Sequence, residues 1–226
     1  MLIKFLGNVD YLSSFADMQE FTQNRTDSTA DEIWICEHPP TFTQGLAGKT
    51  EHLLSPTHIP IIQTNRGGQV TFHGPGQIVA YPLIDLKRLG IFVKEYVYRL
   101  EEAILKTLLQ FKVTGHRVQG APGIYIILDS PFGHQVLKKD QGLADMTSSS
   151  AFSGLGKIAA LGIKVSRNKT YHGLSLNVQM DLRPFDFINP CGFKGLKTID
   201  LSTIGCSPDK NEVAQVLTKK LEMYLS

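Results

Sequence analysis

The sequence predicts an α/β (α+β) fold in which a mixed, largely antiparallel sheet is flanked by helices. Helical periodicity is clear in two long segments, residues 93–111 and the segment that begins near Pro208-Asp209. Short apolar, β-branched runs precede and separate these segments, as is typical of strands. Several neighbouring runs are separated by too few residues for a crossover helix, so the strands cannot all be parallel.

The N-terminal third is expected to contain one helix and four strands. Apolar residues at roughly helical spacing predict a helix over residues 11–24; these residues are Leu12, Phe15, Ala16 and Phe21. Apolar or β-branched runs predict strands at residues 32–37 and 59–64. The second of these strands leads into a glycine-rich segment whose flanks, residues 66–83, suggest two strands joined by a turn as a hairpin.

The rest of the chain is expected to add two helices and three strands. The first of these helices carries an apolar stripe over about five turns, formed by Val93, Tyr96, Leu100, Ile104, Leu108 and Phe111. Strands are expected at residues 123–129, 157–166 and 171–178. The last helix has an inner stripe of Val213, Val216 and Leu221.

Length and composition indicate one ordinary globular domain over residues 1–226. The chain is 42% apolar and 19% charged, which is enough for one sizeable core. Its N-terminal residues resemble neither a secretory signal nor an organellar presequence, and no apolar run approaches the ~20 residues of a membrane span. Three scattered cysteines provide neither a disulfide framework nor a zinc site, which favours a cytoplasmic location.

Residues 129–156 do not fit this regular pattern. They combine proline, glycine, a Lys-Lys-Asp cluster and a Thr-Ser-Ser-Ser run, with little periodicity. A loop of this length is unusual in a compact domain. We therefore expect a loop insertion between two strands.

Basic residues are concentrated in the second half of the chain. Residues 157–197 contain seven Lys/Arg and two acidic residues, whereas residues 1–56 contain three Lys/Arg and eight acidic residues. The basic stretch is either a solvated face or a docking surface for acidic protein partners. Nucleic acid is a less suitable partner, because aromatic residues do not alternate with the basic ones.

The glycine-rich segment 66–77 is the most informative part of the sequence. It reads Arg-Gly-Gly-Gln-Val-Thr-Phe-His-Gly-Pro-Gly-Gln. Adjacent glycines allow a ligand to approach the backbone closely, and the arginine and histidine could supply charge or protons. A turn with no function is the alternative for a lone Gly-Gly pair. The segment lacks the Gly-Lys-Ser/Thr ending of a Walker phosphate loop.

Each of the three cysteines is a candidate nucleophile. Cys36 lies in an apolar run, where a cysteine usually acts as a small buried hydrophobic residue. Cys206 lies in a loop without an obvious partner. Cys191 lies in the tight turn Asn-Pro-Cys-Gly, where Gly192 permits close approach, and it would attack carbonyls well if a positive charge stabilised its thiolate.

Lys157 opens the run Lys-Ile-Ala-Ala-Leu-Gly, and taken alone it is an ordinary surface charge at the start of a strand. Gly154-Leu-Gly156 resembles a dinucleotide fingerprint, but a strand rather than a helix follows it. Gly156-Lys157 resembles a Walker lysine, but Ile158 stands where Ser or Thr is required.

Together these motifs resemble the lipoyl(octanoyl) transferase family, which is related in fold to the catalytic domains of biotin and lipoate protein ligases. The resemblance extends from about residue 59 to residue 198, apart from the insertion. It is based on the segment 66–77 with Tyr81, the Lys-Ile-Ala-Ala-Leu-Gly run, His-Gly-Leu-Ser-Leu-Asn at 172–177, and the Pro-Cys-Gly turn.

The resemblance implies specific roles for individual residues. Cys191 would accept the acyl group and Lys157 would be its catalytic partner, favouring the thiolate and later accepting a proton. The implied substrate-binding residues are Arg66, Gly67, Gly68, Gln69, Val70, Thr71, Phe72, His73, Ala160, Leu161, Gly162, Gly173, Leu174 and Ser175.

The implied reaction moves an octanoyl group from octanoyl-acyl carrier protein to a lysine of a lipoyl domain through a cysteine thioester. The lipoyl domains would be those of 2-oxoacid dehydrogenase complexes and of the glycine cleavage H protein. No cofactor or metal is implied, because the thioester is already activated. Two alternatives stay open: an ATP-dependent lipoate or biotin protein ligase, which needs no cysteine, and a non-enzymatic acyl-binding module.

Overall fold

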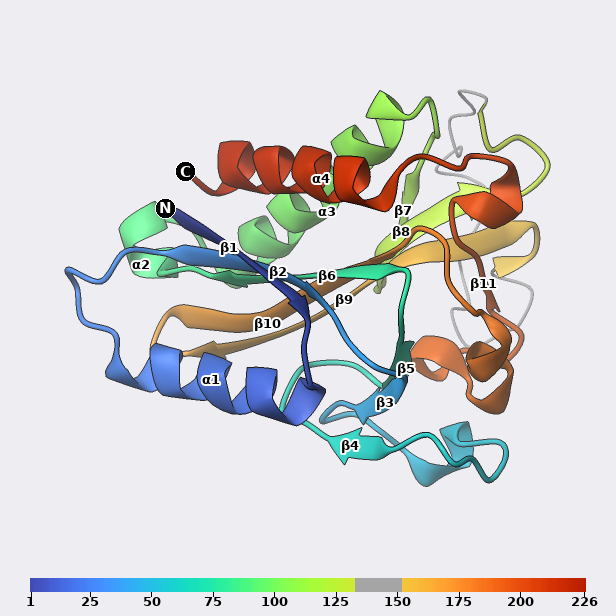
Figure 1. Cartoon of the computed structure of the whole chain (residues 1–226), viewed down its shortest axis with the longest axis horizontal. Helices are drawn as coiled ribbons and strands as arrows, with labels where there is room; N and C mark the ends of the chain where they lie inside the picture. The colour runs from blue at the N-terminus through green and yellow to red at the C-terminus, as the bar shows by residue number, and fades with distance from the viewer. Residues whose placement is uncertain (133–151) are drawn as a thin grey trace.

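The computed structural model describes residues 1–132 and 152–226, whose strands form a large and a small sheet (Figure 1). The large sheet has the order β1-β2-β6-β10-β9-β8-β7, and β11 pairs with β9. Its strands are β1 (Leu2–Asn8), β2 (Glu32–Glu37), β6 (Gln77–Leu83), β7 (His116–Val118), β8 (Ala121–Ile127), β9 (Leu155–Ser166), β10 (Lys169–Asn177) and β11 (Lys197–Thr198). The small sheet contains β3 (Thr41–Gln44), β4 (Ile61–Gln63) and β5 (Val70–His73) in the order β4-β3-β5.

The predicted fold class is confirmed. Five neighbouring pairs of the large sheet are antiparallel: β2·β6, β6·β10, β10·β9, β9·β8 and β8·β7. The pairs β1·β2 and β11·β9 are parallel. The strands β1, β3, β7 and β11 were not expected from the sequence. The strands β3, β7 and β11 have only two to four residues each, and β1 is an edge strand that is largely exposed.

Helices cover both faces of the large sheet (Figure 1). The helices α3 (Val93–Gln110) and α4 (Lys210–Leu225) lie on one face, and α1 (Tyr11–Asn24) lies on the other. The short helix α2 (Leu86–Leu89) precedes α3. Asp10, Asp85 and Asp209 cap the N-termini of α1, α2 and α4 by accepting backbone N–H hydrogen bonds.

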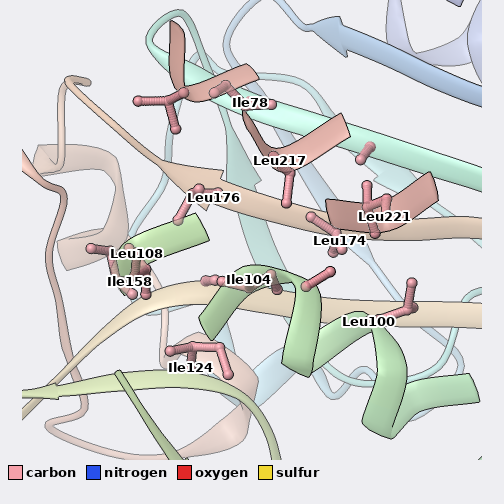
Figure 2. Packing of buried hydrophobic residues seen from close by; sticks show 14 of the residues in the cluster. Ile78, Leu100, Ile104, Leu108, Ile124, Ile158, Leu174, Leu176, Leu217 and Leu221 are labelled. Carbon is pink, nitrogen blue, oxygen red and sulfur yellow. The ribbon is translucent and has the colours of Figure 1, made fainter. Parts of the chain in front are cut away.

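The main hydrophobic core lies between the sheet and the α3–α4 pair (Figure 2). Leu100, Ile104 and Leu108 of α3 are fully buried, as the predicted stripe requires, although Val93 at the start of the helix is 45% exposed. Leu217 and Leu221 of α4 complete this layer. A second cluster lies under α1, and a third joins the small sheet to the segment around Phe185.

The extent of α1 was predicted correctly, and Phe15 and Phe21 pack against the second cluster as partly buried residues. The buried residues are Tyr11, Ser14, Met18 and Thr22, whereas Leu12 is 56% exposed. The buried hydroxyl of Ser14 has a hydrogen-bond partner within the same helix end, because it donates to the Asp10 carbonyl. A face with two small polar residues is not visible as a hydrophobic stripe.

The expected hairpin at residues 66–83 is wrong. The strands β5 and β6 both exist, but β5 pairs with β3 in the small sheet and β6 pairs with β2 and β10 in the large one. The Gly-Pro-Gly turn therefore carries the chain from one sheet to the other. Gly76 adopts φ +87° there, and its N–H donates to the Glu37 carboxylate.

Most of the expected insertion at 129–156 lies outside the described residues. Within the described part of the chain, no helix has the length and apolar character needed to cross a membrane.

We expect Gly76→Ala to destabilise the fold by several kcal/mol. A β-carbon at position 76 would lie 1.7 Å from the Gln179 carbonyl oxygen, in addition to the strain of the positive φ. Gly90→Ala is the matched control, because Gly90 has φ +70° with open space around it, so it should cost only about 1 kcal/mol. Urea unfolding of both variants measures the difference, and equal losses would contradict the account.

Candidate active site

Cys191 lies in a one-turn 3-10 helix, Pro190–Gly192, and it has a strained backbone. Its φ of 56° and ψ of 17° fall in the left-handed region that non-glycine residues rarely adopt. Hydrogen bonds on either side hold the turn: Gly192 N–H donates to Asn189 O, and Asn189 N–H donates to His52 O. Such local strain is common where a functional side chain must be aimed.

Lys157 reaches Cys191 from the start of β9. Its Nζ lies 2.9 Å from the Cys191 Sγ and 3.0 Å from the carbonyl oxygen of Pro122. The two candidate catalytic residues are thus in hydrogen-bond contact although 34 positions separate them. The lysine is not an ordinary surface charge, since the residue is only 3% exposed.

The surroundings of Lys157 determine its charge. Burial by itself would lower the pKa of Lys157, but the negative charge available at Cys191, with a smaller contribution from Tyr125, raises that pKa above its ordinary value. The Nζ also lies 5.2 Å from the centre of the Tyr125 ring, a favourable cation–π distance. We therefore describe Lys157 as an ammonium within hydrogen-bond distance of the Cys191 sulfur.

A cavity of about 470 Å³, its solvent-open mouth included, extends from Cys191 between the small and the large sheet. Twelve of the predicted substrate-binding residues line it: Arg66, Gly68, Gln69, Val70, Thr71, His73, Ala160, Leu161, Gly162, Gly173, Leu174 and Ser175. The predicted segments therefore come together from β5, β9, β10 and the loop before β5. Hereafter we refer to this space as the inner cavity.

A second hollow, hereafter the outer groove, lies on the other side of Cys191. It has a volume of about 840 Å³ with its open part included, and Gly67, Gly120, Pro122, Val97 and Phe193 are among its lining residues. Cys191, Gly68, Gln69, Leu161 and Gly162 border both spaces. The Cys191 sulfur therefore stands where the two spaces meet.

Phe72 is not part of the cavity lining, contrary to the expectation for residues 66–73. Successive side chains of a strand point to opposite faces, so Phe72 points away when Thr71 and His73 point in. Its ring packs 5.4 Å from that of Phe42 and 5.6 Å from that of Phe185. Phe72 is a core residue of the small sheet.

Arg66 holds the glycine-rich loop in shape. Its guanidinium donates to the Thr43 carbonyl and hydroxyl, to the Gly67 carbonyl and to the Gln69 carbonyl. These acceptors occupy most of its five N–H groups. The loop is also attached to the large sheet, because Gly67 N–H donates to the Ile163 carbonyl.

His73 is neutral, which excludes the charged role considered from the sequence. Burial lowers the pKa of His73 to about 3. Its Nδ1 lies 2.7 Å from the Gln77 side-chain oxygen and its Nε2 lies 3.3 Å from the Thr43 hydroxyl. Since Gln77 Oε1 only accepts, Nδ1 carries the proton and Thr43 donates to Nε2.

Four further lining residues, Tyr11, Val79, Tyr81 and His172, were not among the predicted site residues. Tyr81 belongs to the quoted motif, and its hydroxyl lies 2.7 Å from His38 Nε2. Tyr11 stacks on His73 at 5.5 Å, a contact that no local pattern signals. Burial, followed by the Arg66 charge, lowers the pKa of His172 to about 3.

The other two cysteines are unsuited to catalysis. Burial raises the pKa of Cys36 to about 12, and burial also raises the pKa of Cys206. Neither lines the inner cavity or the outer groove.

Comparison with known proteins identifies the family. The model of the lipoyl protein ligase A/B catalytic domain matches residues 10–222. Octanoyltransferases of Albidiferax ferrireducens and Polaromonas naphthalenivorans are each 62% identical over 221 residues, which cover 98% of this chain and 96% of each relative. The chain belongs to the octanoyltransferase family. It is therefore an acyltransferase, and its reaction is octanoyl transfer in protein lipoylation.

The fold is shared with enzymes whose similarity in sequence is low. A lipoate-protein ligase A bound with ATP superposes with a TM-score of 0.68 at 12% identity, covering 99% of this chain and 84% of that one. This likeness confirms the expected ligase-like fold of the octanoyltransferase family, and it establishes nothing about the reaction.

We expect the buried neutral histidines to make the fold sensitive to mild acid. Between a folded pKa of about 3 for His73 and an unfolded value of about 6.5, only the unfolded chain binds the proton. The free energy of unfolding therefore falls as the pH falls, by up to about 1.4 kcal/mol per pH unit for each such histidine.

Urea unfolding at pH 6.5 and pH 5.0 tests this expectation. Wild type should lose about 1 to 2 kcal/mol more over this range than His73→Gln, which has no such proton to bind. Parallel pH dependences in the two proteins would show that His73 is not buried neutral.

Proposed function

We propose that the chain transfers an octanoyl group from octanoyl-acyl carrier protein to the target lysine of lipoyl domains through a thioester on Cys191. The acceptors would be lipoyl domains of 2-oxoacid dehydrogenase complexes and the glycine cleavage H protein. The observation that supports this most is the 2.9 Å contact between Lys157 Nζ and Cys191 Sγ at the junction of two cavities.

In the first half-reaction, the Cys191 thiolate attacks the carbonyl carbon of the octanoyl thioester. The carbon–sulfur bond to the carrier breaks as the bond to Cys191 Sγ forms. The carrier leaves as a thiolate and takes a proton from the Lys157 ammonium, which becomes a neutral amine. No ATP or other activating group is required, because one thioester replaces another.

In the second half-reaction, the neutral amine of the target lysine attacks the Cys191 thioester. An amide bond forms, the carbon–sulfur bond breaks, and Cys191 leaves as a thiolate. Lys157 accepts the proton that the attacking nitrogen loses, which restores the ammonium beside the thiolate. Lys157 therefore donates a proton in one half-reaction and accepts one in the other.

The two spaces beside Cys191 suit these steps. The inner cavity offers the apolar surfaces of Tyr11, Val79, Tyr81 and Ala160 to an octanoyl chain. The outer groove would admit in turn the arm of the carrier and the side chain of the target lysine. Because both arms would need the same path to one sulfur, the first product must leave before the second substrate enters.

An ATP-dependent ligase is the alternative reading, because a ligase that was solved with ATP has the same fold. Such a reaction gives neither Cys191 nor its contact with Lys157 a role. A non-enzymatic acyl-binding module gives them none either. The proposal also includes a cytoplasmic location, which is supported by the free thiol state of all three cysteines.

We expect incubation with octanoyl-acyl carrier protein to add one octanoyl group to Cys191 as a hydroxylamine-labile thioester. Cys191→Ser should lose at least ~10³-fold in transfer rate, as is typical when a nucleophile is removed. Intact-protein mass spectrometry measures the adduct, and Cys36→Ala and Cys206→Ala are controls that should still acylate. Acylation that persisted in Cys191→Ala would exclude the proposed intermediate.

We also expect the basic stretch to contribute to docking of acidic carrier and lipoyl domains. Lys194 and Lys197 are exposed, follow the active-site turn, and form no ion pair with a described residue. Lys194→Glu and Lys197→Glu should raise KM for the carrier while kcat barely changes, and added salt should weaken binding to wild type. Lys219→Glu on α4 is the control, and salt-independent kinetics would leave the stretch a solvated face.

A further inference from the structure

Glu101 is a buried carboxylate that lies outside both spaces at the active site. It belongs to α3, it is 8% exposed, and it lines neither the inner cavity nor the outer groove. Burying a carboxylate is costly unless hydrogen bonds and a counter-charge compensate it. The partners of Glu101 therefore indicate what this residue does.

The two oxygens of Glu101 have separate partners. Its Oε1 accepts a hydrogen bond of 3.1 Å from the Gly123 N–H, and its Oε2 accepts one of 3.0 Å from Arg117 Nε. Arg117 is itself fixed, because it also contacts the Glu102 carboxylate at 2.8 Å and lies 4.3 Å above the Tyr98 ring. The carboxylate is thus held with Oε1 directed at the backbone of β8.

The N–H of Gly123 and the C=O of Pro122 belong to one peptide group. A trans peptide group is planar and rigid, and its N–H and C=O point in opposite directions. The N–H points to Glu101, and the carbonyl oxygen lies 3.0 Å from Lys157 Nζ. Fixing one end of this group therefore fixes the direction of the other.

Gly123 cannot be replaced by a larger residue without displacing Lys157 or the backbone of β9. Its φ is +133°, and a β-carbon there would lie 2.6 Å from Lys157 Cε and 2.6 Å from the Ala159 carbonyl oxygen. The strand pairing is also irregular here, because the register between β8 and β9 shifts between Ile124 and Tyr125. The backbone conformation at Gly123 therefore depends on hydrogen bonds outside the regular strand ladder, such as the one that its N–H donates to Glu101.

We infer that Glu101 is a positioning residue that holds Lys157 against Cys191 through the Pro122–Gly123 peptide group. The carboxylate orients and polarises this group, so that its carbonyl accepts from Lys157 Nζ and directs a further N–H toward the sulfur. Without that acceptor, the buried ammonium would lose one of its two hydrogen-bond partners described above and could turn away from Cys191. The importance of this arrangement for turnover rests on the proposed function.

Four variants separate positioning from simple stability. Glu101→Met removes the carboxylate oxygens that accept from Gly123 and Arg117, and its side chain has a similar size. Glu101→Gln keeps an oxygen that can accept from Gly123 N–H, and Glu102→Gln is the matched control, because Glu102 shares Arg117 but not Gly123. Glu101→Asp retains the charge near Arg117 but is shorter by one carbon–carbon bond, about 1.5 Å, and it serves if Glu101→Met does not fold.

The first readout is the pH dependence of iodoacetamide alkylation at Cys191, followed by peptide mass spectrometry in the full chain. Glu101→Met and Glu101→Asp should raise the pH midpoint by at least about 0.5 unit, in the same direction as Lys157→Ala, because the ammonium no longer stabilises the thiolate. Glu101→Gln and Glu102→Gln should retain the wild-type midpoint. Thermal unfolding of each variant records stability separately.

The second readout is octanoyl transfer to a lipoyl domain, where Glu101→Met should lose about 10-fold or more in kcat with little change in KM. Folded Glu101→Met and Glu101→Asp with a wild-type alkylation midpoint, beside a raised midpoint in Lys157→Ala, would overturn the inference and leave the proposed function standing. An unchanged alkylation midpoint in Lys157→Ala would instead show that Lys157 does not act on Cys191. That result would contradict both the inference about Glu101 and the proposed function.

Discussion

The contact between the Lys157 ammonium and the Cys191 sulfur is the constraint on which the rest of the site depends. A buried ammonium is stable only beside a negative partner and hydrogen-bond acceptors. The fold provides both, with Cys191 in a strained turn on one side and the Pro122 carbonyl on the other. The inner cavity and the outer groove then determine what can reach the sulfur.

The glycine-rich loop has a supporting role. Its arginine is used to hold the loop, and its histidine is a neutral link between Gln77 and Thr43. What the loop presents to a ligand is therefore mainly shape, in the form of exposed backbone and small side chains. Lys157 brings a positive charge to the Cys191 sulfur, whereas the N–H groups of Arg66 are directed at the loop.

Sequence patterns predicted the elements whose signal is local. The five-turn stripe of α3 was found because its apolar residues repeat at the helical period, and β9 and β10 were found as apolar, β-branched runs. Two of the apolar residues that suggested α1, Leu12 and Ala16, are exposed, and polar Ser14 and Thr22 are among its buried residues. The hairpin at 66–83 was wrong because turn chemistry shows that a chain turns but not which strand pairs with it.

The same distinction applies to the site. The Pro-Cys-Gly turn and the Lys-Ile-Ala-Ala-Leu-Gly run indicated Cys191 and Lys157 through resemblance. Their contact depends on the tertiary fold, in which β11 pairs with the start of β9 and brings the preceding turn to Lys157. Phe72 was misplaced because a motif of consecutive residues ignores the alternation of a strand. Glu101 has no signal in sequence at all, since it acts through a backbone group 22 positions away.

The most direct test of the central claim is a chase of the isolated octanoyl-enzyme with an unmodified lipoyl domain. Wild type should pass its octanoyl group to the target lysine in a single turnover. Acylated Lys157→Arg should retain the thioester, because a guanidinium stabilises a thiolate but does not accept a proton. Transfer by Lys157→Arg at the wild-type rate would contradict the claim that this lysine accepts the proton in the second half-reaction.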